Sequence, residues 1–438
     1  MTECNQTTFH FSSVQRRKIQ VSFGNAAVSS DGGLVLIREV ESKLGISKKL
    51  SDILPDYRNP DKVIHQQEHL IRQRLLALCA GYEDLNDHFS LRDDILFQSC
   101  VGSVDRLAST STLCRMENRG DRHSMLQMQK LLVEFFIAKH TRAPKQLILD
   151  FDATDDPTHG NQVGRFYHGY YRSHCFLPLY VFCGNDPLCA LLRPANTDGA
   201  RGAWAVLKYL VKRLRSEWGE ELKIILRGDS GFMRPRMLSW CENNKVDYIV
   251  GYPKNARLLK QSAELIKRSA QLFEKTGEKQ RLFEEYQYQA KSWEHPRKIV
   301  MKAEHTSRGE NNRYIVTTLE GDPQQLYDEG YCGRGDMENR IKEQQLCMFA
   351  DRTSCHEWWP NQLRLLLSTF AYLVIERLRA MAFKKTKWSG LQCSTIRTKL
   401  IKIGAVVSRN TRRIVIRLNS SYPYKADFEQ AYQRVMSG

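Results

Sequence analysis

The chain has 438 residues, of which 42% are hydrophobic, so it is long enough to bury a core and a small disulfide-stapled scaffold is excluded. No window reaches the ~18 consecutive apolar residues of a membrane helix, and the N-terminus lacks the basic start and apolar run of a secretory signal. The net charge of +17 predicts a polyanionic partner, most often nucleic acid.

The positive charge is concentrated near the end of the chain. Residues 361–438 carry 15 Lys and Arg against three Asp and Glu, which accounts for +12 of the net charge. Such a concentration indicates a binding patch more strongly than a diffuse excess does. The twelve cysteines are scattered without a CxxC pair, which favours free buried thiols in a reducing cytoplasm over a zinc site.

The first part of the chain, residues 1–140, is predicted to be mainly helical after a short extended start. Within it, the pattern over residues 63–78 places Ile64, Ile71 and Leu75 on one helical face. Arginines flank that apolar face. We therefore expect a helical N-terminal region that binds DNA.

The pattern changes at residues 141–252, where short apolar runs alternate with helical periodicity. The expected order is strand, strand, strand, helix, strand, helix, strand, and the short early connections predict antiparallel neighbours. These elements are expected at residues 146–154, 165–172, 174–184, 200–218, 221–232, 234–243 and 246–252. The alternation predicts an α/β fold.

Three further segments complete the predicted organisation. Residues 253–327 begin with a charged helix and continue as alternating segments, which predicts a β-rich insertion. Residues 328–385 are expected to form two helices. Residues 386–438 are expected to form a basic β-hairpin followed by a short helix.

Three acidic residues stand at positions that suit a metal site. Asp152 ends the first predicted strand, Asp229 ends the fourth, and Glu338 lies on a later helix. Acids at strand ends meet where α/β folds build their sites. Carboxylate oxygens are hard ligands that suit Mg²⁺, or Mn²⁺ in its place, and a pair of such ions supports phosphoryl transfer.

Spacing alone leaves the first ligand open. Asp150 points to the same side of its strand as Asp152, and Asp155 and Asp156 begin the following loop. His159 and His168 are nearby, but satisfied polar roles are the favoured interpretation for both.

The acids lie in sequence blocks that resemble those of a known family. The blocks LDFDATDDPTHG, ILRGDSGF and YCGRGDMENRIKEQQ, in this order, are similar to the signature blocks of bacterial insertion-sequence DDE transposases. The similarity is to the branch with a Tyr-x2-Arg-x3-Glu-x6-Lys block and a β-strand insertion domain before the Glu. N-terminal blocks such as SSDGGLVLIREVE resemble one subfamily of that branch, so the resemblance covers most of the chain.

The resemblance implies a fold and an activity. The fold would be an RNase H-like (retroviral integrase-like) catalytic core carrying the β-rich insertion. The enzyme would use Mg²⁺ to cut double-stranded DNA at terminal inverted repeats and to join the 3′-OH ends to target DNA. It would act as a homodimer in a synaptic complex in the bacterial cytoplasm, associated with the nucleoid, and some members of the branch form hairpin DNA ends.

The resemblance also assigns the acids. Asp152, which precedes Ala-Thr, matches the first catalytic and metal-binding Asp, and Asp229 matches the second. Glu338 matches the third acid, whereas Glu343 turns roughly 140° away from it on the helix. All three acids are therefore expected to be catalytic residues and metal ligands.

Further positions in the third block would contact DNA. Tyr331 and Arg334 match in register, but Gln345 occupies the position of the family Lys. Lys342 lies four residues after Glu338 on the same helical face, so it is a candidate replacement. Arg334, Glu338 and Lys342 thus place a metal ligand between two cations.

Two more DNA contacts are expected outside that block. Trp293, the only Trp of the insertion, is a candidate for stacking on a flipped base, and a core position is the equal alternative. Arg409, Arg412 and Arg413 surround the turn of the basic hairpin and are expected to bind phosphates.

Two rival functions remain open at the level of sequence. One is an RNase H-like nuclease without strand transfer, and the other is a transposase-derived DNA-binding protein that has lost catalysis. The presence of all three acids argues against the second.

Overall fold

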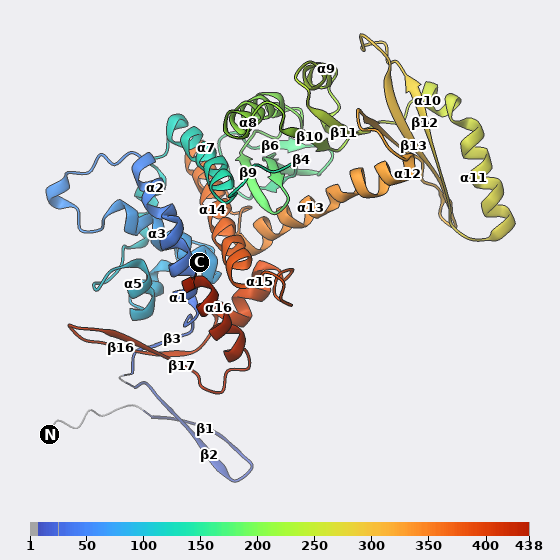
Figure 1. Ribbon diagram of the computed structural model, residues 1–438. Helices are drawn as coiled ribbons and strands as arrows, with labels where there is room; N and C mark the ends of the chain where they lie inside the picture. The colour runs from blue at the N-terminus through green and yellow to red at the C-terminus, as the bar shows by residue number, and fades with distance from the viewer. Residues whose placement is uncertain (1–7, 25, 438) are drawn as a thin grey trace, which may run out of the picture.

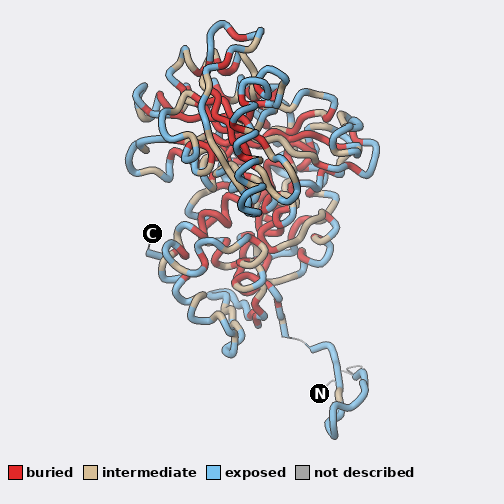
Figure 2. The backbone as a smooth tube through the Cα atoms, turned by 90° about the vertical axis from the view of Figure 1, so that its right-hand side faces the viewer, coloured by how far each residue is buried: buried red, intermediate tan, exposed pale blue. Residues whose placement is uncertain are grey.

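The computed structural model describes residues 8–24 and 26–437. A large mixed β-sheet occupies the centre of one half, and a helical assembly forms the other half (Figure 1). Buried segments gather in both halves, while the first β-hairpin stands apart from them (Figure 2). The predicted α/β class is confirmed at this level. In the described residues, no helix combines the length and hydrophobicity needed to cross a membrane.

The N-terminal region starts with an exposed hairpin and continues as helices, as expected. The apolar faces of these helices pack together and against the long helix α14. Its elements are β1 (Thr8–Val14), β2 (Arg17–Ser22), β3 (Val28–Ser29), α1 (Leu34–Leu44), α2 (Ile46–Ile53), α3 (Gln67–Ala80), α4 (His88–Leu91), α5 (Ile95–Val101), α6 (Thr110–Glu117) and α7 (Arg122–Ala138).

The central sheet has the strand order β12-β13-β15-β11-β10-β4-β8-β9, with β14 paired to β13. Strand β10 runs parallel to both β4 and β11, and the other pairs are antiparallel. The strands are β4 (Gln146–Ala153), β8 (Leu179–Cys183), β9 (Asp186–Leu191), β10 (Lys223–Gly228), β11 (Asp247–Tyr252), β12 (Gln280–Tyr288), β13 (Arg297–Thr306), β14 (Gly309–Glu310) and β15 (Arg313–Thr317).

Both faces of the sheet are covered. On one face, Leu147, Leu149 and Phe151 of β4 pack against helices α7, α8 (Ala203–Trp218) and α9 (Pro235–Asn243). Two helices of the later segment, α10 (Ala256–Gln261) and α11 (Ala263–Thr276), lie beside β12 and β13. On the opposite face, β4 presents Ile148 and then two acids, because side chains alternate along a strand.

A second helical stretch packs on that acidic face. It joins α12 (Pro323–Gln325), a π-turn (Leu326–Tyr331), a 3-10 turn (Cys332–Arg334), α13 (Gly335–Lys342) and a second π-turn (Glu343–Cys347). It contacts the sheet through Leu326 and Tyr327. The buried helix α14 (Trp358–Ala382) then connects the two halves of the molecule.

The C-terminal segment closes against the N-terminal region. It comprises α15 (Cys393–Ile396), β16 (Ala405–Arg409), β17 (Ile414–Leu418) and α16 (Lys425–Ser437). Strand β16 pairs with β17 on one side and with β3 on the other. The predicted basic hairpin and terminal helix are therefore present.

Several predicted elements differ in extent. The helix expected at 63–78 begins only at Gln67, and Ile64 is 88% exposed before it. The strand expected at 174–184 is divided by Pro178, which has no N–H for a sheet ladder, into β7 (Ser173–Phe176) and β8. The expected strand 165–172 is reduced to β6 (Phe166–His168), and β7 pairs with β6 and β5 (Asp156–Pro157).

Strands β5 and β9 lie outside the predicted elements. Strand β9 contains Asp186 and Pro187, both unfavourable for strands, yet it is held at the edge of the sheet beside β8. The cysteines in the described residues are all free and most are buried, in line with the prediction.

Candidate active site

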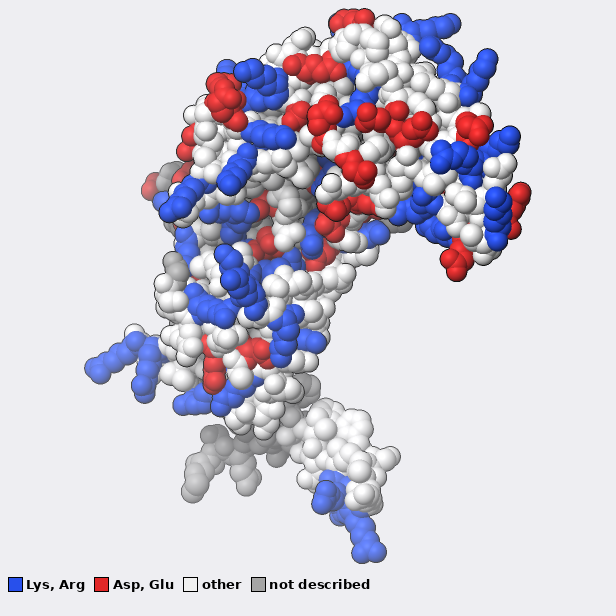
Figure 3. Space-filling view, turned by 45° about the vertical axis from the view of Figure 1, so that its right-hand side comes forward, with Lys and Arg blue, Asp and Glu red and all other residues white. Residues whose placement is uncertain are grey.

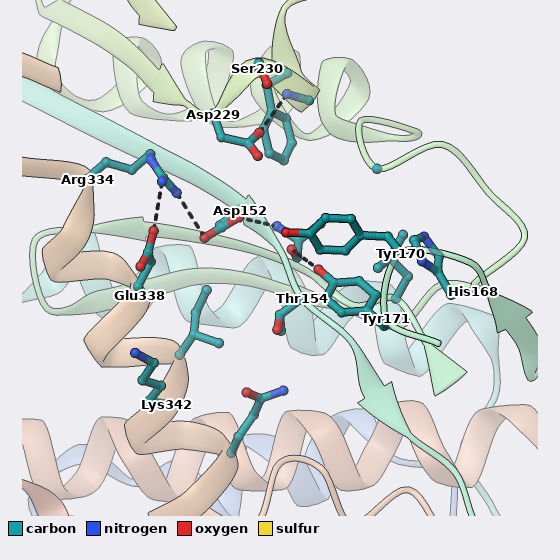
Figure 4. A pocket seen from close by; sticks show the side chains of 17 residues that line it. Asp152, Thr154, His168, Tyr170, Tyr171, Asp229, Ser230, Arg334, Glu338 and Lys342 are labelled. Carbon is teal, nitrogen blue, oxygen red and sulfur yellow. Dashed lines mark hydrogen bonds and ion pairs between the residues drawn. The ribbon is translucent and has the colours of Figure 1, made fainter. Parts of the chain in front are cut away.

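The three predicted acids come together in one cleft. Asp152 lies near the end of β4, and Asp229 directly follows the parallel neighbour β10, so the two meet at the same edge of the sheet. Glu338 reaches the same place from α13 (Figure 4). All three line a cleft of about 620 Å³, although 77 and 109 residues separate them along the chain.

Asp152 is the most constrained of the three. Its side chain is 15% exposed, and Oδ1 accepts the N–H of Ala153 at 2.9 Å. Burial raises its pKa to about 6; the positive charge of Arg334 opposes this shift, and the negative charges of Asp229 and Glu338 add to it. An added cation in the cleft would relieve the cost of ionising this carboxyl.

A guanidinium lies between two of the acids. Arg334 places Nη2 at 2.8 Å from Glu338 Oε1 and Nη1 at 3.5 Å from Asp152 Oδ2. Burial acts to lower the pKa of Arg334, but the neighbouring Asp152 and Glu338 outweigh it, so that pKa is raised. Arg334 thus partly neutralises the acidic cleft, and it is a positioning residue for Glu338.

The turn that carries Asp229 depends on two glycines. The N–H of Gly231 donates to Asp229 Oδ1 at 2.8 Å, which closes the turn after β10. On the neighbouring strand, a Cβ at Gly251 would lie 2.7 Å from Tyr331 Oη and 2.8 Å from the backbone nitrogen of Ser230. Only glycine permits this approach, so Gly251 packs Tyr331 against the Asp229 turn. Sequence reasoning did not single out Gly251.

The acids near Asp152 differ in where their side chains lie. Asp150 is buried and forms two hydrogen bonds with Arg227, at 2.5 and 2.9 Å. Burial nevertheless raises its pKa above the ordinary value. Arg227 also donates to the carbonyl of Gly330 at 2.8 Å, so the Asp150–Arg227 pair ties the Glu338 helix to the sheet.

The loop acids have other partners. Asp156 is buried and accepts from Thr353 Oγ1 at 2.9 Å. The carbonyl of Asp155 accepts from Gln345 Nε2 at 2.8 Å, and the Asp155 side chain does not line the cleft. Among the four acids from Asp150 to Asp156, only Asp152 therefore faces the cleft.

The rival acid on the later helix is also accounted for. Glu343 is buried, pairs with Arg379 and Arg340 at 3.2 Å each, and accepts the N–H of Cys393 at 2.9 Å. It stabilises the packing of α14 and α15 and does not reach the cleft. Lys342, by contrast, lines the cleft together with Gln345 (Figure 4).

The donor set fits a hard divalent cation. Three carboxylates from three elements face one open cleft, and oxygen donors are the ligands that Mg²⁺ and Mn²⁺ prefer. Within residues 8–24 and 26–437, no three His, Cys, Asp or Glu side chains already have the spacing of a metal site. The Arg334 guanidinium lies between Asp152 and Glu338 and holds their carboxylates apart. This accounts in part for the absence of metal-site spacing among the three acids.

The opposite wall of the cleft is aromatic, which was not predicted. His168, Tyr170 and Tyr171 line it, and Figure 4 shows both tyrosine rings directed towards Asp152. The run RFYHGYYR carried the signal, but it was interpreted as a strand. His159 lines a separate cavity and does not join the acids.

Trp293 is not available to a DNA base in this structure. Its side chain is 4% exposed and packs edge-on against Tyr252 and Tyr288, with ring centroids 5.4 and 5.8 Å away. The guanidinium of Arg297 lies 4.9 Å above the indole ring. The stacking hypothesis for Trp293 is therefore corrected to a core role. The basic neighbours that suggested it include Arg297, which is itself buried.

The tail arginines lie at the predicted hairpin. Arg409 ends β16, and the turn is closed because Asn410 Oδ1 accepts the N–H groups of Arg412 and Arg413, each at 3.0 Å. Their side chains are exposed. Lys and Arg cover much of the face in Figure 3, and Asp and Glu are more frequent in its upper part.

Not all of the tail's charge reaches the surface. Four arginines after residue 361 are turned inward and bound to acids or carbonyls within the fold: Arg364, Arg377, Arg379 and Arg397. The surface patch is consequently smaller than the sequence count suggested.

Comparisons with known proteins bear on this site. The family model for a transposase DDE domain (group 1) matches residues 11–437. A search of curated proteins finds no significant match. Among solved structures, a piggyBac transposase synaptic complex with hairpin DNA is similar at 13% identity, with a TM-score of 0.43, over 86% of this chain and 82% of that one. The family match spans nearly the whole chain, and this protein therefore belongs to the DDE transposases.

Proposed function

We propose that this chain is the transposase of a bacterial insertion sequence, with an RNase H-like core that cuts the element's DNA ends and joins them to a target. The observation that carries the proposal is the meeting of Asp152, Asp229 and Glu338 in one open cleft. Acids from three separate elements repel one another at this edge, and the single guanidinium of Arg334 neutralises them only in part, so their convergence favours a role in holding cations.

The three acids would hold Mg²⁺, with Mn²⁺ as a substitute. When bound there, such ions activate an attacking oxygen and stabilise the leaving oxygen in phosphoryl transfer. Asp152 binds a cation as the carboxylate, and the cation's charge would offset the burial that raises the pKa of Asp152. No protein nucleophile is required, because water and then the DNA 3′-OH attack the phosphorus.

The residues around the acids position the DNA. Arg334 and Lys342 flank Glu338 on one helical face, so they can bind phosphates beside the scissile bond. Gln345 stands where the family has Lys, and its amide is bound to the backbone of Asp155. Lys342 therefore takes the phosphate-binding role, and Tyr331 supports Arg334.

The partners follow from the same proposal. The element's terminal inverted repeats and target DNA are the substrates, and two copies of the chain hold the ends in a synaptic complex. Arg409, Arg412 and Arg413 contribute sequence-independent phosphate contacts. The protein acts in the bacterial cytoplasm at the nucleoid, and hairpin DNA ends are an intermediate to be tested.

The experiment is a cleavage and strand-transfer assay with DNA carrying the inverted repeats that flank the coding region. With Mg²⁺, the wild type should nick the ends and join a pre-cut 3′ end to target DNA. Asp152→Asn, Asp229→Asn and Glu338→Gln should each abolish both products while retaining binding. Asp336→Asn, at an exposed acid on the same helix as Glu338, is the matched control and should remain active.

The products also separate the rival functions. Cleavage without joined products would identify a nuclease that lacks strand transfer. End binding without any cleavage would identify a DNA-binding protein derived from a transposase. Either result would replace the proposed function.

A further inference from the structure

The aromatic wall of the cleft has a feature that the acids do not explain. Strand β6 and the turn that follows it expose three large aromatic side chains, Phe166 and Tyr167 on the strand and Tyr170 in the turn, and Tyr170 is 84% exposed. Exposed aromatic clusters are uncommon because they leave large apolar surfaces in water. Tyr170 is at the same time one of the residues that line the catalytic cleft.

The Tyr170 ring is held in place by its neighbour. Tyr171 contacts it edge-on, with ring centroids 5.0 Å apart, and Tyr171 Oη is within 3.5 Å of the carbonyl of Ala153. The ring of His168 also packs on Tyr171, with ring centroids 4.9 Å apart. The turn is closed by the N–H of Arg172, which donates to the carbonyl of His168 at 2.8 Å. The turn is thus anchored to the strand that carries Asp152.

The surroundings of the turn suit a polyanion. Residues 159–176 contain Arg165 and Arg172 and no Asp or Glu. Arg172 is exposed at the turn itself. Proteins bind unpaired bases with exposed aromatic rings on segments whose charged side chains are cations, since every base has a π face and each nucleotide carries a phosphate.

Resting on the proposed function, we propose that Tyr170 is a stacking platform for an unpaired DNA base at the end that enters the cleft. The base would leave the duplex and lie on the exposed ring, which would place its phosphate near Asp152. This assigns to the β6–β7 turn the role that the buried Trp293 cannot perform.

The proposal can be tested without cleavage. In EDTA, the wild type is titrated with two duplexes of one sequence, one blunt and one with a three-nucleotide unpaired end that carries 2-aminopurine. The wild type should bind the unpaired end more tightly and quench its fluorescence. Tyr170→Ala should weaken binding of the unpaired end by about 5- to 100-fold and leave blunt-end binding unchanged.

Two matched variants complete the design. Tyr170→Phe keeps the ring and should retain the preference and the quenching. Tyr57→Ala removes a tyrosine that is 81% exposed and outside the cleft, and it should behave as the wild type. Because Tyr170 is exposed, Tyr170→Ala should melt at the wild-type temperature.

The possible outcomes separate the two proposals. Equal binding of both duplexes by the wild type, or an unpaired-end preference that survives in Tyr170→Ala, would overturn the stacking role alone. A wild type that binds neither duplex would contradict the proposed function as well. A Tyr170→Ala variant that changes only self-association would assign the turn to contacts between protein copies instead.

Discussion

Replacing Asp152 with asparagine should stabilise the metal-free protein while it abolishes activity. The side chain is mostly buried near Asp229 and Glu338, and the charge of Arg334 does not offset the cost of burial, so the negative charge of Asp152 is unfavourable without a bound cation. Asparagine has nearly the same shape and no charge. Arg334 keeps an anionic partner in the variant, because Glu338 lies 2.8 Å from it.

The size of the effect follows from the pKa of Asp152. It is about 6 in the folded protein against an ordinary value of 3.8, so above pH 6 ionisation costs the fold about 3 kcal/mol. The cost is absent below pH 3.8, because both states then hold the proton. Between pH 3.8 and pH 6 the cost grows, because the unfolded chain releases its proton at a lower pH than the folded protein does. At pH 5 the cost reaches about half of its full value.

The assay is thermal unfolding in EDTA at pH 5 and pH 7.5. For 438 residues, about 3 kcal/mol corresponds to a melting temperature about 3 °C higher for Asp152→Asn than for the wild type at pH 7.5. The gap should halve at pH 5, and Mg²⁺ should raise the wild type alone. A variant that melts lower than the wild type, or a gap that does not change with pH, would refute the reasoning.

Three other predictions follow from the packing and the charge. Gly251→Ala should destabilise the protein by about 1–3 kcal/mol and reduce cleavage, because the added Cβ would collide with Tyr331. Denaturant unfolding and the cleavage assay measure these two effects. Wild-type values in both would contradict the prediction. Trp293→Ala should lower the unfolding free energy by about 3–5 kcal/mol, because it removes a large buried side chain. A variant that stays stable but forms hairpin DNA ends more slowly would restore the base-stacking hypothesis. Replacing Arg412 or Arg413 with Ala should weaken binding to all DNA sequences alike. The slope of the log binding constant against log salt concentration should fall in magnitude by ~0.9 for each lost contact. A change in sequence preference at constant slope would argue against phosphate binding.

Much of the geometry of the candidate site could be predicted because it follows strand order. Asp152 and Asp229 end adjacent parallel strands, and the sequence marked both as apolar runs that finish in an acid. The pairing of Glu338 with Arg334 was likewise visible as an i, i+4 spacing. Spacing alone left the first acid open among Asp150, Asp152, Asp155 and Asp156, and the family resemblance was needed to choose Asp152.

The structural features that the sequence did not predict depend on contacts between residues far apart in the chain. The burial of Asp150 becomes visible only when Arg227 lies on the neighbouring strand. The sequence left Trp293 open between a DNA-facing and a core position, and the core position becomes visible only when β13 turns Arg297 inward over its ring. The inward arginines of the tail, such as Arg377, were counted as surface charge because their partner Asp186 lies on a strand that was not predicted.

The most direct test of the account is the anomalous diffraction of crystals grown with Mn²⁺. Manganese is expected in the cleft, with Asp152, Asp229 and Glu338 all contributing ligands and Arg334 displaced from between them. Manganese bound elsewhere, or bound in the cleft without contact to one of the three acids, would contradict the central claim.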